Sequence, residues 1–214
     1  MLFITDIDGT LLDSARSISS SAIDTIKKFS GIELTHQYFL PYIGTPIREV
    51  LKEYIQELRL DEAVVYFREK LIVNGSTETK VMPFAFQVIT QLKNSGVTIC
   101  AATNKHRDLA EQVLEQHGLL SYFSNIYGSD KYAPKPSPAM ILSAKSDFPF
   151  EHVYMLGDRP EDVIASRLAG VQSIYISNEC DYLISDSSLH PSFTITSWLE
   201  ILEIQTIREA VNIK

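Results

Sequence analysis

The sequence predicts an α/β fold, with a parallel sheet covered by helices on both faces and a small helical cap domain inserted near the N-terminus. From Val81 onward, short apolar segments alternate with amphipathic segments about every 20 to 30 residues, a spacing typical of parallel sheets. Between residues 14 and 80 we find only helical patterns. Asp6, Thr103 and Asp158 each follow an apolar segment, where parallel sheets bind their ligands.

The first predicted strand leads directly into two carboxylates. Residues Leu2–Thr5 are apolar or small and predict a short buried strand, followed by Asp6 and Asp8. Gly9 then permits a tight turn. Like charges at such close range raise the free energy unless a cation or hydrogen bonds offset them. The stretch is therefore either an acidic solvated turn or a cation and phosphate site at a strand end.

The helical stretch that follows has the features of a separate cap. Its predicted helices are 18–29, 46–58 and 62–72. Residues 14–80 hold nine Lys and Arg and nine Asp and Glu, so the rest of the chain carries the whole net charge of −8. We therefore assign residues 14–80 to a helical cap, and residues 1–13 and 81–214 to an α/β core. The two connections, near Arg16 and Pro83, are the expected hinges.

The remaining elements of the core alternate between strands and helices. Gly118 and Gly170 are expected to end two of the helices, because glycine is favoured just beyond a helix C-terminus. The predicted strands are Val97–Ala102, Ser124–Tyr127, His152–Leu156 and Gln172–Ile176, and the predicted helices are His106–His117, Pro138–Ala144, one that begins after Asp158, and a last one that begins near Ser197.

Composition and charge exclude several classes of protein. The 214 residues are 45% hydrophobic and 21% charged, as in ordinary globular proteins, with a net charge of −8 and a pI of about 5.1. The acidic balance argues against nucleic acid or an anionic membrane as a partner. Two cysteines, Cys100 and Cys180, are too few for a disulfide framework. Without a long apolar stretch or a signal-like N-terminus, the expected location is the cytoplasm.

Six polar residues near predicted strand ends suit phosphoryl transfer: Asp6, Asp8, Thr103, Lys135, Asp158 and Asp162. Mg²⁺ prefers oxygen ligands, so the carboxylates could hold it together with phosphate oxygens. A carboxylate can also accept a phosphoryl group, while a lysine and a hydroxyl hold the phosphoryl oxygens. Each residue alone has a simpler explanation. Asp158 and Asp162 could be an acidic helix start, Thr103 a strand-end hydroxyl, and Lys135 a loop charge between prolines.

Four segments of the sequence resemble the motifs of the haloacid dehalogenase superfamily of phosphohydrolases. They are DIDGT at residues 6–10, AATN ending at Asn104, APKPSP around Lys135, and GDRPEDV from Gly157, in the family's order. The segments YIGTPIREV, MPF and ASRLAGV resemble the phosphoglycolate phosphatase-like branch of the family. This resemblance implies a Rossmann-like core with a helical cap.

The resemblance also implies a role for each motif residue. Asp6 would be the nucleophile, and Asp8 would protonate the leaving oxygen and later activate water. Thr103, the Asn104 amide and Lys135 would bind the phosphoryl oxygens. The implied direct Mg²⁺ ligands are Asp6, the backbone carbonyl of Asp8 and Asp158. Asp162 would act through a bound water or as a neighbour of these ligands.

Four further polar residues have two interpretations each. Arg48, in the cap, could pair with a carboxylate or second phosphate of the substrate, or be a solvated charge. Lys105 and His106 could touch substrate, but a solvated helix start is the favoured interpretation. We expect Arg159 to be a solvated charge.

The predicted function is that of a Mg²⁺-dependent phosphatase acting on a small phosphorylated metabolite through an aspartyl-phosphate. Phosphoglycolate, a sugar phosphate, a nucleoside monophosphate and pyrophosphate are the candidate substrates. The alternatives are a phosphosugar mutase of the same superfamily and a non-catalytic regulatory binding protein on the same fold. The sequence is compatible with a monomer or a homodimer.

Overall fold

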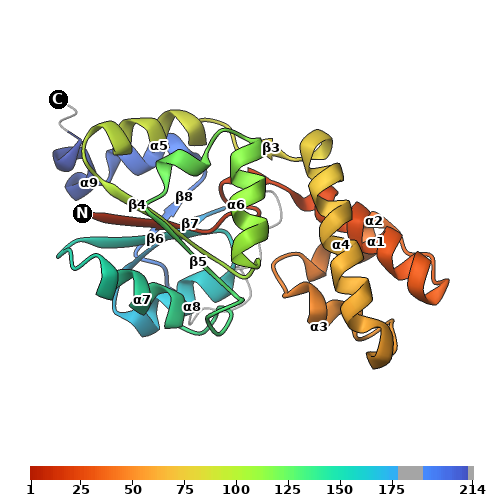
Figure 1. Ribbon diagram of the computed structural model, residues 1–214. Coiled ribbons are helices and arrows are strands. Elements are labelled where there is room, and N and C mark those ends of the chain that lie inside the picture. The colour runs from red at the N-terminus through yellow and green to blue at the C-terminus, as the bar shows by residue number, and fades with distance from the viewer. Residues whose placement is uncertain (178–189, 212–214) are drawn as a thin grey trace.

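The structure is a computed structural model that describes residues 1–177 and 190–211. Its main sheet has six strands in the order β5-β4-β1-β6-β7-β8, and every neighbouring pair is parallel (Figure 1). This confirms the predicted α/β fold with a parallel sheet. The strands are β1 (Leu2–Thr5), β4 (Thr98–Thr103), β5 (Asn125–Gly128), β6 (Val153–Gly157), β7 (Gln172–Ile176) and β8 (Phe193–Ile195).

Helices cover both faces of this sheet because successive strand residues point to opposite sides. Phe3 packs in the core cluster on the face of α5 (Ala85–Asn94), α6 (Arg107–Gln116) and α9 (Gln205–Ala210). Leu2 and Ile4 pack on the opposite face, against α7 (Ala139–Asp147) and α8 (Pro160–Ala169). Figure 1 shows α5 and α9 above the sheet and α7 and α8 below it. The central strands are therefore buried on both faces.

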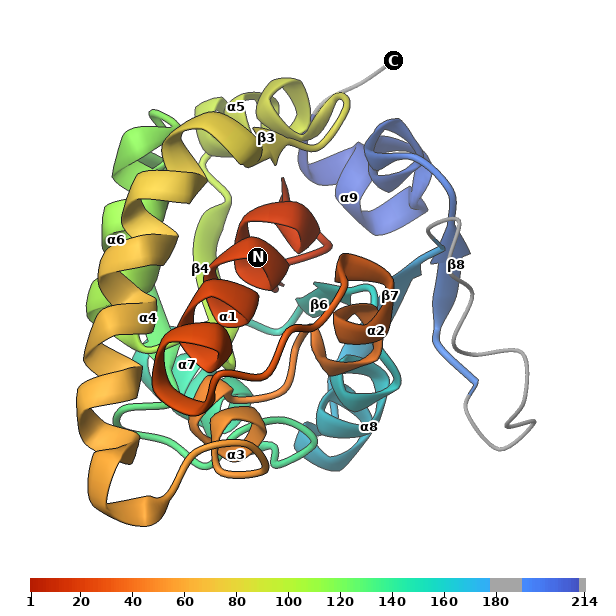
Figure 2. The same cartoon turned by 90° about the vertical axis from the view of Figure 1, so that its right-hand side faces the viewer.

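The helical cap lies beside the core, to the right in Figure 1 and toward the viewer in Figure 2. A short antiparallel pair, β2 (Leu12–Asp13) and β3 (Lys80–Val81), joins cap and core at the predicted boundary. The cap contains α1 (Ala15–Ser30), α2 (His36–Phe39), the 3₁₀ helix η1 (Leu40–Tyr42), α3 (Ile47–Leu51) and α4 (Glu57–Glu78). Its apolar cluster also contains Leu109 of α6, so the cap packs directly on the core.

Two of the helices expected in the cap differ from the structure. The predicted helix 46–58 is wrong beyond Leu51, because the chain turns there. The N–H groups of Tyr54 and Ile55 both donate to the Leu51 carbonyl, and Ile55 is buried in the cap cluster. Burial of Ile55 requires this turn, which helix periodicity alone does not reveal. The predicted helix 62–72 is part of the longer α4.

The C-terminal part of the core also departs from expectation. A 3₁₀ helix, η3 (Trp198–Glu203), begins where an α-helix was predicted, and α9 follows it. Strand β8 was not predicted. Trp198 is fully buried and its indole N–H donates to the Thr10 carbonyl at 2.9 Å, so η3 supports the turn after β1. Cys180 lies outside the described residues.

Candidate active site

The carboxyl ends of β1, β4 and β6 meet at one edge of the sheet, and the predicted site residues follow them there. Asp6 follows β1, and its N–H donates to the Leu156 carbonyl of β6 at 2.9 Å. Thr103 ends β4, and Asp158 follows β6. Since β1 lies between β4 and β6, the sheet order brings these three residues together.

Gly9 allows the turn after β1 to approach Asp158 closely. Its φ is +80°, and a Cβ atom there would lie 2.4 Å from the Asp158 Oδ2 atom. The next residue, Thr10, donates its hydroxyl to the Asp158 Oδ1 atom at 2.6 Å. A side chain at Gly9 would therefore be strained by its backbone and would also displace Asp158.

Lys135 is buried at the centre of the site and uses its ammonium for three contacts. The Nζ atom lies 2.8 Å from the Asp6 Oδ1 atom, 2.6 Å from the Asp162 Oδ1 atom and 2.9 Å from the Ala102 carbonyl oxygen. Burial alone would lower the pKa of Lys135, but Asp162 and Asp6 outweigh it and raise the pKa. Lys135 is therefore a fixed cation, and the interpretation as a loop charge is wrong.

Three carboxylates gather around this cation and suit a hard metal ion. Asp6, Asp158 and Asp162 each offer one oxygen, and these oxygens lie within 4.8 Å of one another. Burial, with repulsion from neighbouring carboxylates, raises the pKa of Asp6 to about 6 against the opposing effect of Lys135. Burial and the same kind of repulsion raise the pKa of Asp158 to about 7. A bound cation would relieve this repulsion, so the donor set fits Mg²⁺.

Asp162 is also tied to its own helix. Its Oδ2 atom accepts the Arg159 N–H at 3.0 Å, which caps α8, while its Oδ1 atom pairs with Lys135. Gly157 makes room for it, since a Cβ atom there would lie 2.2 Å from the Asp162 carboxyl group. Both oxygens are thus engaged by the protein, an arrangement that suits a carboxylate acting beside the metal ligands.

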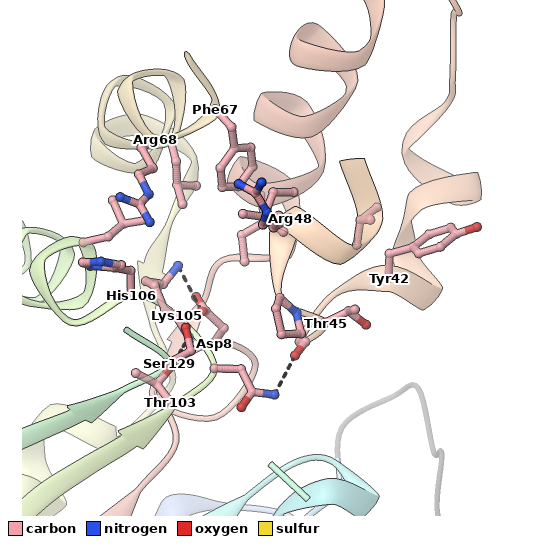
Figure 3. A pocket seen from close by; sticks show the side chains of 18 of the residues that line it. Asp8, Tyr42, Thr45, Arg48, Phe67, Arg68, Thr103, Lys105, His106 and Ser129 are labelled. Atoms are coloured by element: carbon pink, nitrogen blue, oxygen red, sulfur yellow. Dashed lines mark hydrogen bonds and ion pairs between the residues drawn. The ribbon is translucent and has the colours of Figure 1, made fainter. Parts of the chain in front are cut away.

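Asp8 lies apart from this cluster and faces the cap. Its Oδ1 atom accepts the hydroxyl of Ser14, at the start of the cap, at 2.6 Å. Its Oδ2 atom pairs with the Lys105 Nζ atom at 3.0 Å (Figure 3). The Lys105 side chain is only 6% exposed, so its interpretation as a solvated charge is wrong. Its position directly after Thr103 and Asn104 could have indicated, from the sequence, that Lys105 lies at the site.

Asn104 joins three loops through its side chain. Its Oδ1 atom accepts the Lys135 N–H at 2.8 Å, and its Nδ2 atom donates to the Gly44 carbonyl of the cap at 3.0 Å. Arg159 also lies close to Gly44, and its side chain is 18% exposed, so the expectation of a solvated charge is wrong here too. Asn104, directly after β4, therefore contacts the cap.

A cavity of about 200 Å³ lies between core and cap (Figure 3). The core contributes Asp6, Asp8 and the residues from Thr103 to His106. The cap contributes mostly apolar side chains, and Arg48 and Arg68. Arg48 lines the cavity, but its guanidinium pairs with Asp61 and, at 3.3 Å, with Glu57. The apolar lining of the cap consists chiefly of Phe39, Val50, Val64, Phe67 and Leu71.

Known proteins resemble this chain over most of its length. A family model described as haloacid dehalogenase-like hydrolase matches residues 3–176. The chain belongs to this family. The hydrolase is 29% identical to a phosphoglycolate phosphatase of Aquifex aeolicus, over 80% of this chain and 82% of that protein. It is 26% identical to the pyrophosphatase PpaX of Oceanobacillus iheyensis, over 93% and 94%.

A solved structure of a predicted phosphoglycolate phosphatase from Haemophilus somnus has the same fold. Its TM-score is 0.85 at 20% identity, with 95% of this chain and 97% of that chain covered. Together, the family model and the named relatives show a haloacid dehalogenase-type hydrolase that is similar to phosphoglycolate phosphatases and pyrophosphatases. No helix in the described ranges, 1–177 and 190–211, is long and apolar enough to cross a membrane.

Proposed function

We propose that the enzyme hydrolyses a small phosphate monoester by way of a phosphoryl group transferred to Asp6. The observation that carries the proposal is the contact of the buried Lys135 ammonium with the Asp6 carboxylate, at 2.8 Å. This contact holds one Asp6 oxygen in place, and a carboxylate fixed at a strand end can act as a nucleophile toward phosphorus. Lys135 also supplies positive charge for the phosphoryl oxygens.

Other residues of the chain would complete the reaction. Thr103 and the Asn104 amide would bind phosphoryl oxygens at the end of β4. Asp8, which lines the cavity, would give a proton to the leaving oxygen and later take one from the attacking water. The cap would exclude bulk water from the cavity. We assign Mg²⁺ to Asp6, Asp158 and the Asp8 carbonyl, with Asp162 beside them; it would neutralise charge on phosphate and carboxylates.

The test is phosphate release from a panel of small phosphate monoesters and pyrophosphate, with and without Mg²⁺. We expect release that requires Mg²⁺ in the wild type and falls at least about a thousandfold in Asp6→Asn, since the nucleophile is lost. Asp24→Asn is the matched control, because Asp24 is exposed on α1 and does not line the cavity.

Two results would contradict the proposal. Equal release by wild type and Asp6→Asn would show that Asp6 is not the nucleophile. No release from any substrate by folded, Mg²⁺-bound protein would exclude a general phosphatase. Exchange of phosphate between positions of a sugar phosphate, without release, would indicate the mutase instead.

A further inference from the structure

The charge in the cavity is divided between its two ends. Of the described residues that line it, the acidic ones, Asp6 and Asp8, both belong to the core. The cap contributes no acidic side chain to the lining, but it contributes two arginines. A phosphate ester whose far end is also anionic would match this division, with its phosphoryl group at the core and its second charge at the cap.

The two arginines differ in what already neutralises them. The Arg48 guanidinium has two carboxylate partners, Asp61 and Glu57, both of which are exposed at the outer surface of the cap. Among the described residues, no carboxylate lies within ion-pairing distance of Arg68, and no side-chain hydrogen bond reaches it. Of the two cap arginines that line the cavity, Arg68 is thus the one whose side chain has its full hydrogen-bonding capacity left for a ligand.

The position of Arg68 also suits contact with a ligand. It lies on α4 next to Phe67, whose buried ring fixes that turn of the helix in the cap cluster. Figure 3 shows its side chain extending from α4 toward His106 of the core. The His106 Nδ1 atom is 3.8 Å from the Asp108 Oδ2 atom, beyond hydrogen-bond distance. Cap and core thus present two nitrogen groups to the same side of the cavity.

The remaining wall of the cap limits what can join the two charges. Phe39, Val50, Val64 and Leu71 offer no hydrogen-bonding side chain, and the hydroxyl groups of this wall are those of Tyr42 and Thr45. The cavity of about 200 Å³ is smaller than the roughly 300–1,000 Å³ usual for drug-sized ligands. On size, a short linker therefore fits this cavity better than a sugar ring does.

We propose that Arg68, facing His106, forms a second anion subsite that selects phosphate esters with a carboxylate or second phosphate on a short linker. The proposal rests on the proposed function only in placing the substrate phosphoryl group at the core end. Arg68 is a specificity-determining residue in this proposal, and Arg48 is not.

The first experiment measures binding without chemistry. Phosphonoacetate, 3-phosphonopropionate and 4-phosphonobutyrate are titrated into the Mg²⁺-loaded protein by calorimetry, each beside its carboxamide, which has the same shape without the charge. We expect at least one acid to bind about ten to a hundred times more tightly than its amide, as a charged hydrogen bond allows. Arg68→Gln should remove that preference, and Arg68→Lys should keep part of it.

Two arginine variants serve as comparisons. Arg59→Gln is the control, because Arg59 lies on the same helix but pairs with Glu62 outside the cavity; it should keep the full preference. Arg48→Gln should keep most of it. No preference in the wild type, equal weakening of acid and amide in Arg68→Gln, or loss of preference in Arg48→Gln alone would overturn the subsite.

Hydrolysis separates this proposal from the proposed function. Wild type should hydrolyse phosphoglycolate faster than its amide in kcat/KM, and Arg68→Gln should equalise the two. Hydrolysis of both compounds at equal rates by the wild type would overturn the subsite and leave the phosphatase standing. A carboxylate preference in binding, with no hydrolysis of any ester, would overturn the phosphatase and leave the subsite standing.

Discussion

Core and cap use charged side chains in opposite ways. In the core, Lys135, Asp6 and Asp162 are buried together, so each charge is held by its neighbours. In the cap, Arg48 pairs with carboxylates that are exposed to solvent, and such pairs add little stability. The comparison indicates that the core fixes the chemistry through interactions that cannot be changed singly. The cap can change its charges, and with them its substrate, at little cost in stability.

The largest effect should follow from removal of the buried cation in the core. Lys135→Met leaves Asp6 and Asp162 buried without their partner, and breaking a buried pair costs about 3–5 kcal/mol of stability. We also expect kcat to fall at least about a hundredfold, because the phosphoryl oxygens lose a cation. Thermal denaturation and phosphate release measure the two effects.

The matched change in the cap is Arg48→Met, which removes an exposed cation. Its stability should change by less than about 1 kcal/mol. A loss in Arg48→Met as large as that in Lys135→Met would refute the distinction between buried and exposed charge.

An intermediate effect should come from the crowded carboxylates of the metal-free protein. Burial and repulsion raise the pKa of Asp158 to about 7, above its ordinary value of 3.8. The folded state therefore holds a proton that the unfolded state releases between about pH 4 and 7, so stability falls as pH rises through this range. Asp158→Asn removes this carboxylate and should stabilise the metal-free protein at pH 7. We expect a gain of only about 1–2 kcal/mol, because Asp158 is partly exposed and solvent weakens the repulsion.

This gain has a defined pH and metal dependence. At pH 4 it should disappear, since Asp158 is then protonated in the folded wild type. With Mg²⁺ it should shrink or reverse, because the wild type gains binding energy that the variant loses. Melting temperatures at both pH values, with and without Mg²⁺, provide the measurement. If the variant were less stable than the wild type at pH 7 without metal, Asp158 would not destabilise the folded protein by repulsion.

The smallest effect should lie at the contact between the two regions. Asn104→Ala removes the hydrogen bonds of this side chain to the Gly44 carbonyl of the cap and to the Lys135 N–H, and so loosens the contact between cap and core. We expect KM to rise about five- to tenfold, and the backbone amides of residues 43–45 to exchange hydrogen faster. Gln116→Ala is the control, because Gln116 donates to the Ile72 carbonyl of the cap away from the cavity. Equal changes in both variants would mean that Asn104 contributes nothing specific to the site.

The sequence alone predicted the parallel sheet of the core and the candidate site residues at its edge. Apolar segments followed by Asp6, Thr103 and Asp158 predicted parallel strands with functional groups at one edge, because parallel strands end on the same side. Strands β1, β4, β5, β6 and β7 were predicted to within one residue, since burial on both faces leaves uninterrupted apolar runs. The composition of residues 14–80 separated the cap from the core.

Tertiary structure decided what local patterns do not encode. The turn after Leu51 depends on burial of Ile55 in the cap, and η3 depends on the buried hydrogen bond of Trp198 to Thr10. Local periodicity contains neither contact. Lys105 and Arg159 have the sequence of solvated charges at helix starts, but the cap covers that edge of the sheet and buries most of each side chain.

The two arginines that line the cavity, Arg48 and Arg68, show most clearly what the sequence does not determine. From the sequence, Arg48 was a candidate for substrate binding and Arg68 was one charge among several on a helix. The fold brings Asp61 and Glu57 onto Arg48 and turns Arg68 into the cavity. The candidate reacting groups are predicted by short motifs whose spacing the sequence displays. The availability of a charge for a ligand depends on which distant residues neutralise it, and only the packing of the cap determines that.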